Sequence, residues 1–184
     1  MKGGVLMDTL IINAFGGPGA GKSTMCLGCT YLLRVKGINA EYVSEYAKDL
    51  AYDERFDILD DTMEHQKIIF TEQKRRIDRL VGKVPVIFND SPLVLSIVYA
   101  NDKTKEFSEM ILNEFNKYKN YNFFIKRNSG LYIQTGRKQS LIESMDKDHE
   151  IRLFLNNNNI PFFVMEQKDI IDVTEKITKM LQGQ

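Results

Sequence analysis

The sequence predicts an α/β protein with a doubly wound, parallel sheet of five strands, covered by helices on both faces in three α/β/α layers. Three observations support this fold: short apolar segments alternate with longer amphipathic ones, a glycine-rich turn joins the first of each kind, and polar residues end several apolar segments. Alternating strands and helices favour parallel pairing, because the helices supply the crossover connections. Ligands of such sheets bind beyond the carboxyl ends of the strands, so functional residues are expected there.

Five apolar segments rich in β-forming residues are expected to be the strands. They cover 9–15, 40–44, 84–89, 122–126 and 160–165. The expected helices cover 23–36, 62–81, 92–100, 104–118, 139–155 and 171–182, with a mixed helix and loop at 45–60. No repeat or linker interrupts this order, so residues 1–184 are expected to form a single domain.

Composition narrows the class of protein. The chain has 184 residues, with 25 basic and 25 acidic side chains. This balance provides no net field that favours nucleic acid or an anionic membrane, so a nucleic-acid partner is not favoured. No apolar run approaches the roughly 20 residues that span a bilayer. The apolar stretch at the start of the sequence is too short for a secretory signal. A cytoplasmic protein without a membrane partner is therefore expected.

The cysteines and histidines indicate no metal centre. Cys26 and Cys29 form a CxxC inside the first expected helix, where redox chemistry and simple packing are both open and packing is favoured. His65 and His149 are far apart in sequence and lack the spacing of metal ligands.

The turn at residues 16–23 reads Gly-Gly-Pro-Gly-Ala-Gly-Lys-Ser and fits the phosphate-loop pattern GxxxxGK[ST] between a strand and a helix. Its glycines let backbone N–H groups approach phosphate oxygens, and the following helix N-terminus adds partial positive charge. We expect Lys22 to reach the β- and γ-phosphates of ATP, and the Ser23 hydroxyl to bind Mg²⁺. The residues expected to bind the nucleotide are Gly17, Gly19, Ala20, Gly21, Lys22, Ser23 and Thr24.

Two carboxylates follow expected strands. Asp90 comes at the end of the third strand and is the best partner for Mg²⁺, although a helix cap is the alternative. Glu45 comes after the second strand, where it could orient an acceptor hydroxyl and take its proton; a solvated charge at a helix start is the alternative. Which of the two is the general base stays open.

A basic segment follows the fourth expected strand. Arg127 and Arg137 stand there among Lys126, Lys138 and several turn residues. Phosphoryl transfer needs positive charge near the transferred group, so a short basic lid with these two arginines is the preferred interpretation, and a basic surface loop is the alternative. Tyr46, Tyr52 and Phe56 could stack on a base or pack in the core.

These residues together resemble a known family, the phage-type AAA-domain ATPases related to the ribosylnicotinamide kinase domain of NadR. The resemblance covers nearly the whole chain and rests on residues 16–23, 44–48, 90–92 and 136–137. It implies a small P-loop kinase fold in which Glu45 contacts the acceptor, Gln73 contacts its ring, and Arg127 and Arg137 belong to the lid. Two departures concern the acceptor: Ser91-Pro92 replaces an acidic sequence of the family, and the chain has no tryptophan.

The sequence therefore predicts an ATP- and Mg²⁺-dependent kinase that phosphorylates a small nucleoside-like or nucleotide-like acceptor, in the host cytoplasm if the protein is phage-encoded. Lys22, Asp90, Glu45, Arg127 and Arg137 are the expected catalytic residues. Ser23 and Asp90 are the expected metal ligands, and Glu45, Tyr46 and Gln73 the expected acceptor contacts. Two alternatives remain: a kinase acting on a hydroxymethylated base in DNA, and a regulatory P-loop ATPase without a small acceptor.

Overall fold

The chain forms a five-stranded sheet in which all strand pairs are parallel, in the order β2-β3-β1-β4-β5. The computed structural model describes residues 8–128 and 140–183. The strands are β1 (Leu10–Phe15), β2 (Ala40–Val43), β3 (Val86–Asn89), β4 (Lys119–Ile125) and β5 (Phe163–Met165). The glycine-rich turn leaves the central strand of this sheet, so its position is fixed by pairing on both sides.

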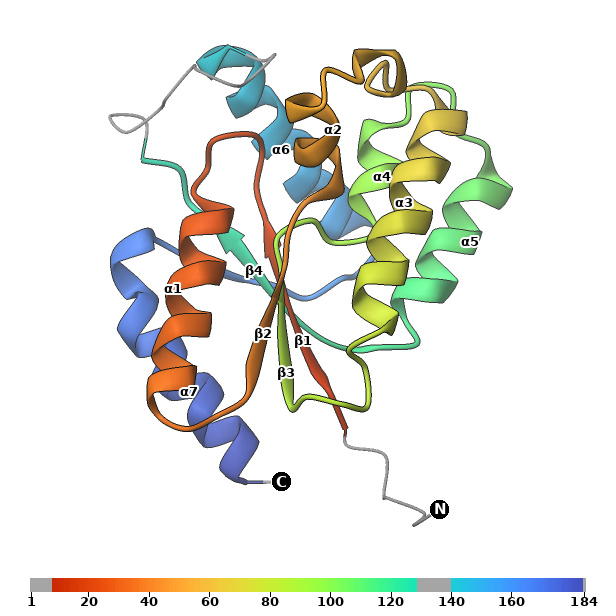
Figure 1. Cartoon of the computed structure of the whole chain (residues 1–184). Coiled ribbons are helices and arrows are strands. Elements are labelled where there is room, and N and C mark those ends of the chain that lie inside the picture. Colours follow the sequence, from red (N-terminus) through yellow and green to blue (C-terminus); the bar gives the residue numbers. More distant parts are fainter. Residues whose placement is uncertain (1–7, 129–139, 184) are drawn as a thin grey trace, which may run out of the picture.

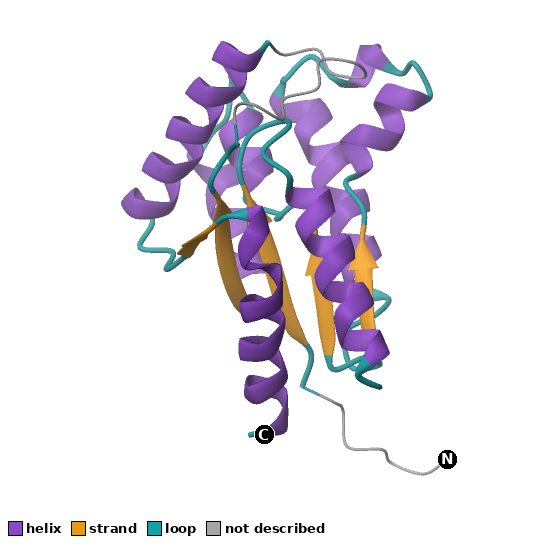
Figure 2. Ribbon diagram, turned by 90° about the vertical axis from the view of Figure 1, so that its left-hand side faces the viewer, coloured by secondary structure: helices purple, strands orange, loops and turns teal. Residues whose placement is uncertain are grey.

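Helices cover both faces of the sheet, which gives the three predicted layers (Figures 1 and 2). α1 (Lys22–Val35) and α7 (Ile170–Gln182) pack on one face. The other face carries α3 (Met63–Asp78), α4 (Leu95–Tyr99), α5 (Lys105–Phe115) and α6 (Leu141–Asn157), and α2 (Tyr46–Tyr52) packs against α3. Two short 3₁₀ turns cover Phe56–Ile58 and Gln167–Asp169. Among the helices of the described ranges, none is long and apolar enough to cross a membrane.

The predicted fold class is confirmed, with small differences at the strand ends. β4 begins at Lys119, three residues before the predicted start, and β5 begins at Phe163, three residues after it. The earlier start of β4 is not apparent from the sequence, because the polar side chains of Lys119 and Asn120 weaken the apolar pattern that marks a buried strand. Pro161 delays β5, because proline has no N–H to give to the sheet.

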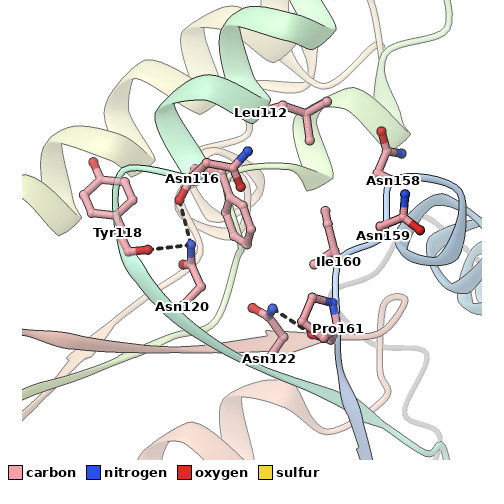
Figure 3. Close-up of a pocket in the computed structure, with 10 residues that line it drawn as sticks. Leu112, Asn116, Tyr118, Asn120, Asn122, Asn158, Asn159, Ile160 and Pro161 are labelled. Atoms are coloured by element: carbon pink, nitrogen blue, oxygen red, sulfur yellow. Dashed lines mark hydrogen bonds between the residues drawn. The ribbon is translucent and has the colours of Figure 1, made fainter.

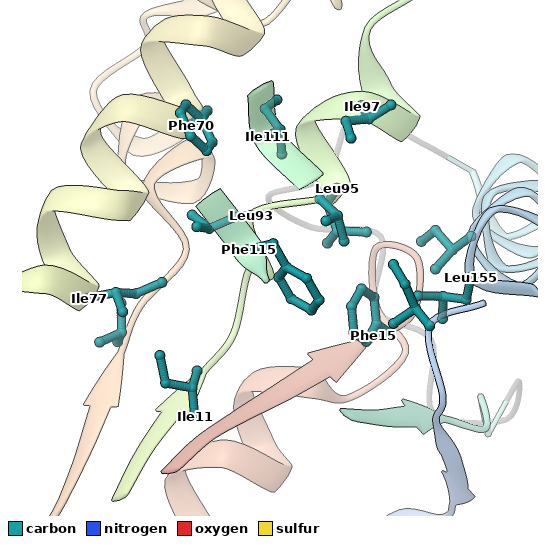
Figure 4. Packing of buried hydrophobic residues seen from close by; sticks show 14 of the residues in the cluster. Ile11, Phe15, Phe70, Ile77, Leu93, Leu95, Ile97, Ile111, Phe115 and Leu155 are labelled. Atoms are coloured by element: carbon teal, nitrogen blue, oxygen red, sulfur yellow. The ribbon is translucent and has the colours of Figure 1, made fainter. Parts of the chain in front are cut away.

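Two apolar cores lie on either side of the sheet. One lies under α3 to α6 and includes Ile11, Phe15 and Ile87, as Figure 4 shows in part. The other lies under α1 and α7 and includes Ile12 and Phe88. All six residues of β1 are buried, which explains why all of them except Asn13 are apolar.

The two cysteines belong to this second core. Cys26 and Cys29 lie on the buried face of α1 and are free thiols. Burial raises the pKa of both thiols, so they stay protonated and unreactive at neutral pH. Their placement fits the packing interpretation of the CxxC sequence.

A row of buried side-chain amides crosses the sheet within the core under α3 to α6. Gln73 Nε2 donates to Asn89 Oδ1 at 3.1 Å, and Asn89 Nδ2 donates to Asn13 Oδ1 at 3.0 Å. Asn13 Nδ2 donates to Asn122 Oδ1 at 3.0 Å, and Asn122 Nδ2 donates to the Pro161 carbonyl at 2.9 Å. Each amide donates in the same direction, so the bonds can polarise one another. The row ties α3 to the three central strands and to the chain entering β5.

Asn13 is the residue on which this row depends, because Asn89 Nδ2 and the side-chain oxygens of Asn120 and Asn122 all bond to it. Asn13→Leu leaves those groups without a partner in the core. We expect the free energy of unfolding to fall by about 2–5 kcal/mol, measured by urea denaturation. Ile11→Leu, on the same face of β1, is the matched control and should cost less than about 1.5 kcal/mol. Equal effects of the two substitutions would contradict the role of the row.

Candidate active site

The glycine-rich turn forms a loop between β1 and α1 at the carboxyl edge of the sheet (Figure 1). Gly16, Gly19 and Gly21 have φ values of 144°, 75° and 98°. Other residues rarely adopt these conformations, so the path of the loop depends on glycine at these positions. The loop ends at the N-terminus of α1, where unpaired backbone N–H groups form a site for anions.

Lys22 lies inside this loop. The residue is 8% exposed, and its ammonium group donates to the Gly17 carbonyl at 3.2 Å. The side chain therefore folds back over the loop and holds a full positive charge beside the backbone N–H groups. This concentrates positive potential at the start of α1, as a bound polyphosphate requires.

Asp90 lies directly behind the loop, just after β3. Ser23 Oγ donates to Asp90 Oδ2 at 2.5 Å, which joins the start of α1 to the end of β3. The residue is fully buried, and within the described part of the chain its Oδ1 has no hydrogen-bond partner. A buried carboxylate oxygen without a partner is costly unless a ligand satisfies it.

These oxygens fit a magnesium ion. The Ser23 hydroxyl and the unpartnered Asp90 oxygen are hard ligands of the kind that Mg²⁺ prefers, and Mg²⁺ takes few protein ligands beside phosphate oxygens and water. Ser23 and Asp90 are thus brought together as the sequence predicts for metal ligands, and their role stays a prediction.

Tyr42 is a member of this cluster that sequence analysis missed. Its hydroxyl donates to Asp90 Oδ2 at 2.9 Å, the oxygen that Ser23 also uses. Burial and the nearby Asp90 carboxylate raise the pKa of Tyr42, so the hydroxyl stays protonated and remains a donor. The strand pairing places Tyr42 beside Phe88, two residues before Asp90 and on the same face. Only knowledge that β2 lies next to β3 could have revealed this contact.

Glu45 stands at the start of α2, at the same edge of the sheet. Burial raises the pKa of its carboxyl group, and the positive charge of Lys22 opposes this shift while Asp90 adds to it. These influences mean that Glu45, Lys22 and Asp90 lie close enough to interact. The fold therefore gathers the three residues expected after β1, β2 and β3 around one site.

The turn that carries Glu45 is held from behind by Gln73. Gln73 Oε1 accepts from the Tyr46 N–H at 3.0 Å, and its Nε2 donates to the Ser44 carbonyl at 3.1 Å as well as to Asn89. The residue is 2% exposed. Its amide thus bonds protein groups at both ends, and the contact with an acceptor that the resemblance implies stays a prediction.

Tyr46 is also engaged by α3. The Arg76 guanidinium lies 4.9 Å from the centre of the Tyr46 ring, donates to Ser44 Oγ at 3.0 Å, and pairs with Asp49 at 2.7 Å. One face of the Tyr46 ring is therefore covered by a cation. Arg76, which the sequence presents as one of several basic residues on a helix, fixes the position of the turn.

Gln66 is a second buried glutamine on α3 that sequence analysis missed. It is 5% exposed and lies about two helical turns before Gln73, toward the edge of the sheet where the loop is. Within the described ranges no hydrogen bond engages its side-chain amide. The spacing of seven residues, which places two side chains on one helical face, was the available indication.

Arg127, expected in a basic lid, lies against the phosphate loop. Its nitrogens donate to Asp148 Oδ2 at 2.8 Å, to the Pro18 carbonyl at 2.7 Å and to the Ser144 carbonyl at 3.2 Å. The guanidinium therefore binds the loop and α6. Arg137, Lys138 and the rest of the expected lid at residues 129–139 lie outside the described residues.

The two other aromatic candidates are on the surface. Tyr52 is 72% exposed and Phe56 is 59% exposed, so the core-packing interpretation is wrong for both. Their stacking on a base stays a prediction.

A hollow of about 360 Å³ lies away from the loop, at the amino edge of the sheet (Figure 3). Asn120 and Asn122 form part of its wall, but their amides already bond Asn13 and nearby carbonyls. It is the outer end of the amide row and adds no group to the candidate site.

The sheet order, the loop and the residues behind it define a protein with the fold of P-loop nucleoside and nucleotide kinases. The chain belongs to a family described as AAA domain, whose model matches residues 11–172. Among curated proteins, none matches the chain.

Solved structures share this fold at low sequence identity. NadR protein in complex with NR is 21% identical, with a TM-score of 0.66; the match covers 91% of this chain and 51% of NadR, so the chain spans about half of that protein. Deoxyadenosine kinase from M. mycoides is 18% identical, with a TM-score of 0.59, over 95% of this chain and 100% of the kinase. Thymidylate kinase from Ehrlichia chaffeensis is 16% identical, with a TM-score of 0.60, over 94% and 98%.

The raised pKa of Glu45 can be tested by measuring how the stability of the protein changes with pH. Ionised Glu45 is disfavoured in the fold, so its contribution to stability is present below its ordinary pKa and is lost as pH rises through the raised value. We expect Glu45→Gln to unfold at higher urea concentration than wild type at pH 8, and the difference to vanish near pH 4. Glu106→Gln, at an exposed position of α5, is the matched control for this substitution. A Glu45→Gln protein that is less stable at pH 8 would contradict the burial of this charge.

Proposed function

We propose that this protein is a kinase that transfers the γ-phosphate of ATP, bound with Mg²⁺, to a small nucleoside-like or nucleotide-like acceptor. The observation that supports it is the convergence of Lys22, Asp90 and Glu45 at the carboxyl ends of β1, β3 and β2. A phosphate-binding loop alone would suit any nucleotide-binding protein. A second carboxylate near Lys22, in addition to Asp90, suits an acceptor.

The ATP side of the site would work by positioning and by charge. Backbone N–H groups of the loop and the Lys22 ammonium would hold the β- and γ-phosphates, and Ser23 and Asp90 would hold Mg²⁺. The metal, when bound, supplies charge neutralisation between the phosphates. Tyr42 and Ser23 both donate to Asp90 Oδ2, which leaves Oδ1 for the ion or its water.

The acceptor side would depend on Glu45. An ionised carboxylate can orient an acceptor hydroxyl and take its proton as the new P–O bond forms. Burial raises the pKa of Glu45, which makes its ionised carboxylate a stronger base. The positive charge of Lys22 limits this rise in pKa. The turn around Glu45 is held by Gln73 and Arg76, so the backbone that carries the carboxylate has a fixed position.

The acceptor class follows from the kinds of protein that share the fold. NadR binds NR, and the other two are named a deoxyadenosine kinase and a thymidylate kinase, so nucleosides and nucleotides are the first acceptors to test. A kinase for a hydroxymethylated DNA base and a regulatory ATPase remain outcomes of the same test, and we argue neither of them.

A screen of nucleosides, deoxynucleotides and ribosylnicotinamide with ATP and Mg²⁺ tests the proposal. We expect acceptor-dependent formation of ADP, and a loss of at least about 100-fold in turnover for Lys22→Ala and for Asp90→Asn, because each removes charge from the transferred phosphate or its metal. Lys67→Ala, exposed on α3, is the matched control and should turn over like wild type.

Three results would contradict the proposed function. ATP turnover that needs no acceptor would favour the regulatory ATPase, and phosphorylation of a modified oligonucleotide alone would favour the DNA-base kinase. Full turnover by folded Lys22→Ala would refute the assignment of the loop.

Gln66 offers a test of the acceptor side. Its amide is available for an acceptor, whereas that of Gln73 holds the Glu45 turn. We expect Gln66→Met to raise the KM for the acceptor by about tenfold, the effect of one lost hydrogen bond of roughly 1.4 kcal/mol, with the KM for ATP unchanged. Lys67→Met, one position further along the helix, is the control. An unchanged KM for the acceptor would exclude Gln66 as a contact.

A further inference from the structure

Three side-chain nitrogens of Arg127 bind the phosphate loop and α6. Arg127 comes directly after β4 and its side chain is 5% exposed. Nη1 donates to the Pro18 carbonyl at 2.7 Å, Nη2 to the Ser144 carbonyl at 3.2 Å, and Nε to Asp148 Oδ2 at 2.8 Å. A guanidinium with three fixed partners has lost the freedom that a contact to a transferred phosphate would need.

Asp148 completes this arrangement from α6. Its second oxygen, Oδ1, accepts from the Gly17 N–H at 2.5 Å, while Oδ2 pairs with Arg127. The carboxylate therefore bridges the first turn of the loop and the arginine. Arg127 and Asp148 together contact two consecutive residues of the loop, Gly17 and Pro18, from outside. We call these two side chains the loop clamp.

Gly17 shows how closely the clamp approaches. A Cβ atom at this position would lie 2.6 Å from the Ser144 carbonyl oxygen, 3.0 Å from Asp148 Oδ1 and 3.2 Å from Arg127 Nη2. The first distance is far below a normal contact and involves a backbone atom. Only glycine fits here. The requirement for glycine at position 17 therefore comes from the close contact with the clamp and α6, and not from its backbone angles.

The contact with Pro18 has a consequence for the anion site. The described residues contain no cis peptide bond, so the Pro18 carbonyl and the Gly19 N–H point to opposite sides of one planar unit. Arg127 draws the carbonyl outward, and the N–H must then point inward, toward the side on which phosphate would bind. The clamp thereby orients a phosphate-binding donor that neither of its side chains touches.

The charges of the clamp matter as well. Asp148 alone would place a negative charge beside a site for polyphosphate and would repel it. Arg127 neutralises that charge while it holds the backbone, so the two side chains are useful only as a pair. Removing Arg127 leaves the carboxylate uncompensated, which is worse than removing both charges.

We propose that Arg127 and Asp148 are positioning residues that hold residues 17–19 in the nucleotide-binding conformation before ATP arrives. The proposal rests on the ATP site proposed above and assigns Arg127 a role distinct from that of a lid arginine. A loop already ordered by the clamp loses less freedom when the nucleotide binds, so the clamp raises affinity for every nucleotide that uses the loop. ADP and ATP should depend on it equally.

Calorimetric titration of the full chain with Mg·ADP and with a nonhydrolysable Mg·ATP analogue tests this without any acceptor. We expect Arg127→Met to weaken binding of both nucleotides by about tenfold. In the Arg127→Met protein, Asp148→Asn should restore at least about threefold of that loss, because asparagine keeps an acceptor for the Gly17 N–H and removes the repelling charge. Arg152→Met, an exposed arginine of α6, is the control and should bind like wild type.

Arg127→Lys provides a second variant if Arg127→Met is poorly folded, as judged by its thermal unfolding. It keeps the charge but loses the fork that holds Pro18 and Ser144, and should also weaken ADP and ATP equally. Weakening confined to the ATP analogue would show that Arg127 touches the γ-phosphate and would overturn the proposal, as would the absence of any recovery with Asp148→Asn. Unchanged affinity in the arginine variants overturns the clamp alone. A wild-type protein that binds neither nucleotide overturns the proposed function, and the clamp with it.

Discussion

The hydrogen bond from Ser23 to Asp90 is the interaction on which the candidate site depends. Ser23 belongs to the first turn of α1 and Asp90 follows β3, so the bond connects the glycine-rich loop to the neighbouring strand. It also fixes the Asp90 carboxylate, in which Oδ2 accepts from Ser23 and Tyr42 and Oδ1 has no hydrogen-bond partner among the described residues. The sheet makes this possible, because the parallel register aligns Asn13 of β1 with Asn89 of β3 and brings both strand ends to one level.

The protein holds the two halves of the site by different means. At the proposed nucleotide site, a glycine-rich backbone is restrained by two charged side chains, Arg127 and Asp148. At the proposed acceptor site, a short turn is restrained by the buried Gln73, which belongs to the amide row across the core. Both arrangements place rigid support behind the residues to which we assign a role, as a site that works by positioning requires.

Buried polar groups provide this rigidity because few alternative arrangements satisfy them. Asn13, Asn89, Asn122 and Gln73 are each at most 4% exposed, and each finds its partners in the row. An apolar core of the same volume could shift with little loss, whereas a shift here would leave amides unpaired. The geometry around Glu45 is thus linked to packing at the opposite edge of the sheet.

The sequence by itself determined the sheet, the loop and the residues at the strand ends. Periodicity and glycine placement are local properties that reveal the strands and the loop. Ligands bind at the carboxyl ends of parallel strands, and this rule identified Lys22, Ser23, Glu45 and Asp90 as candidate site residues. Only the tertiary structure decided what Gln73, Tyr42, Arg127 and Asp148 contact. These contacts join residues that are apart in the chain, from 16 positions between Gln73 and Asn89 to 131 between Gly17 and Asp148. No local pattern carries that information, because such partners are set by which strands are neighbours and by how each helix crosses the sheet.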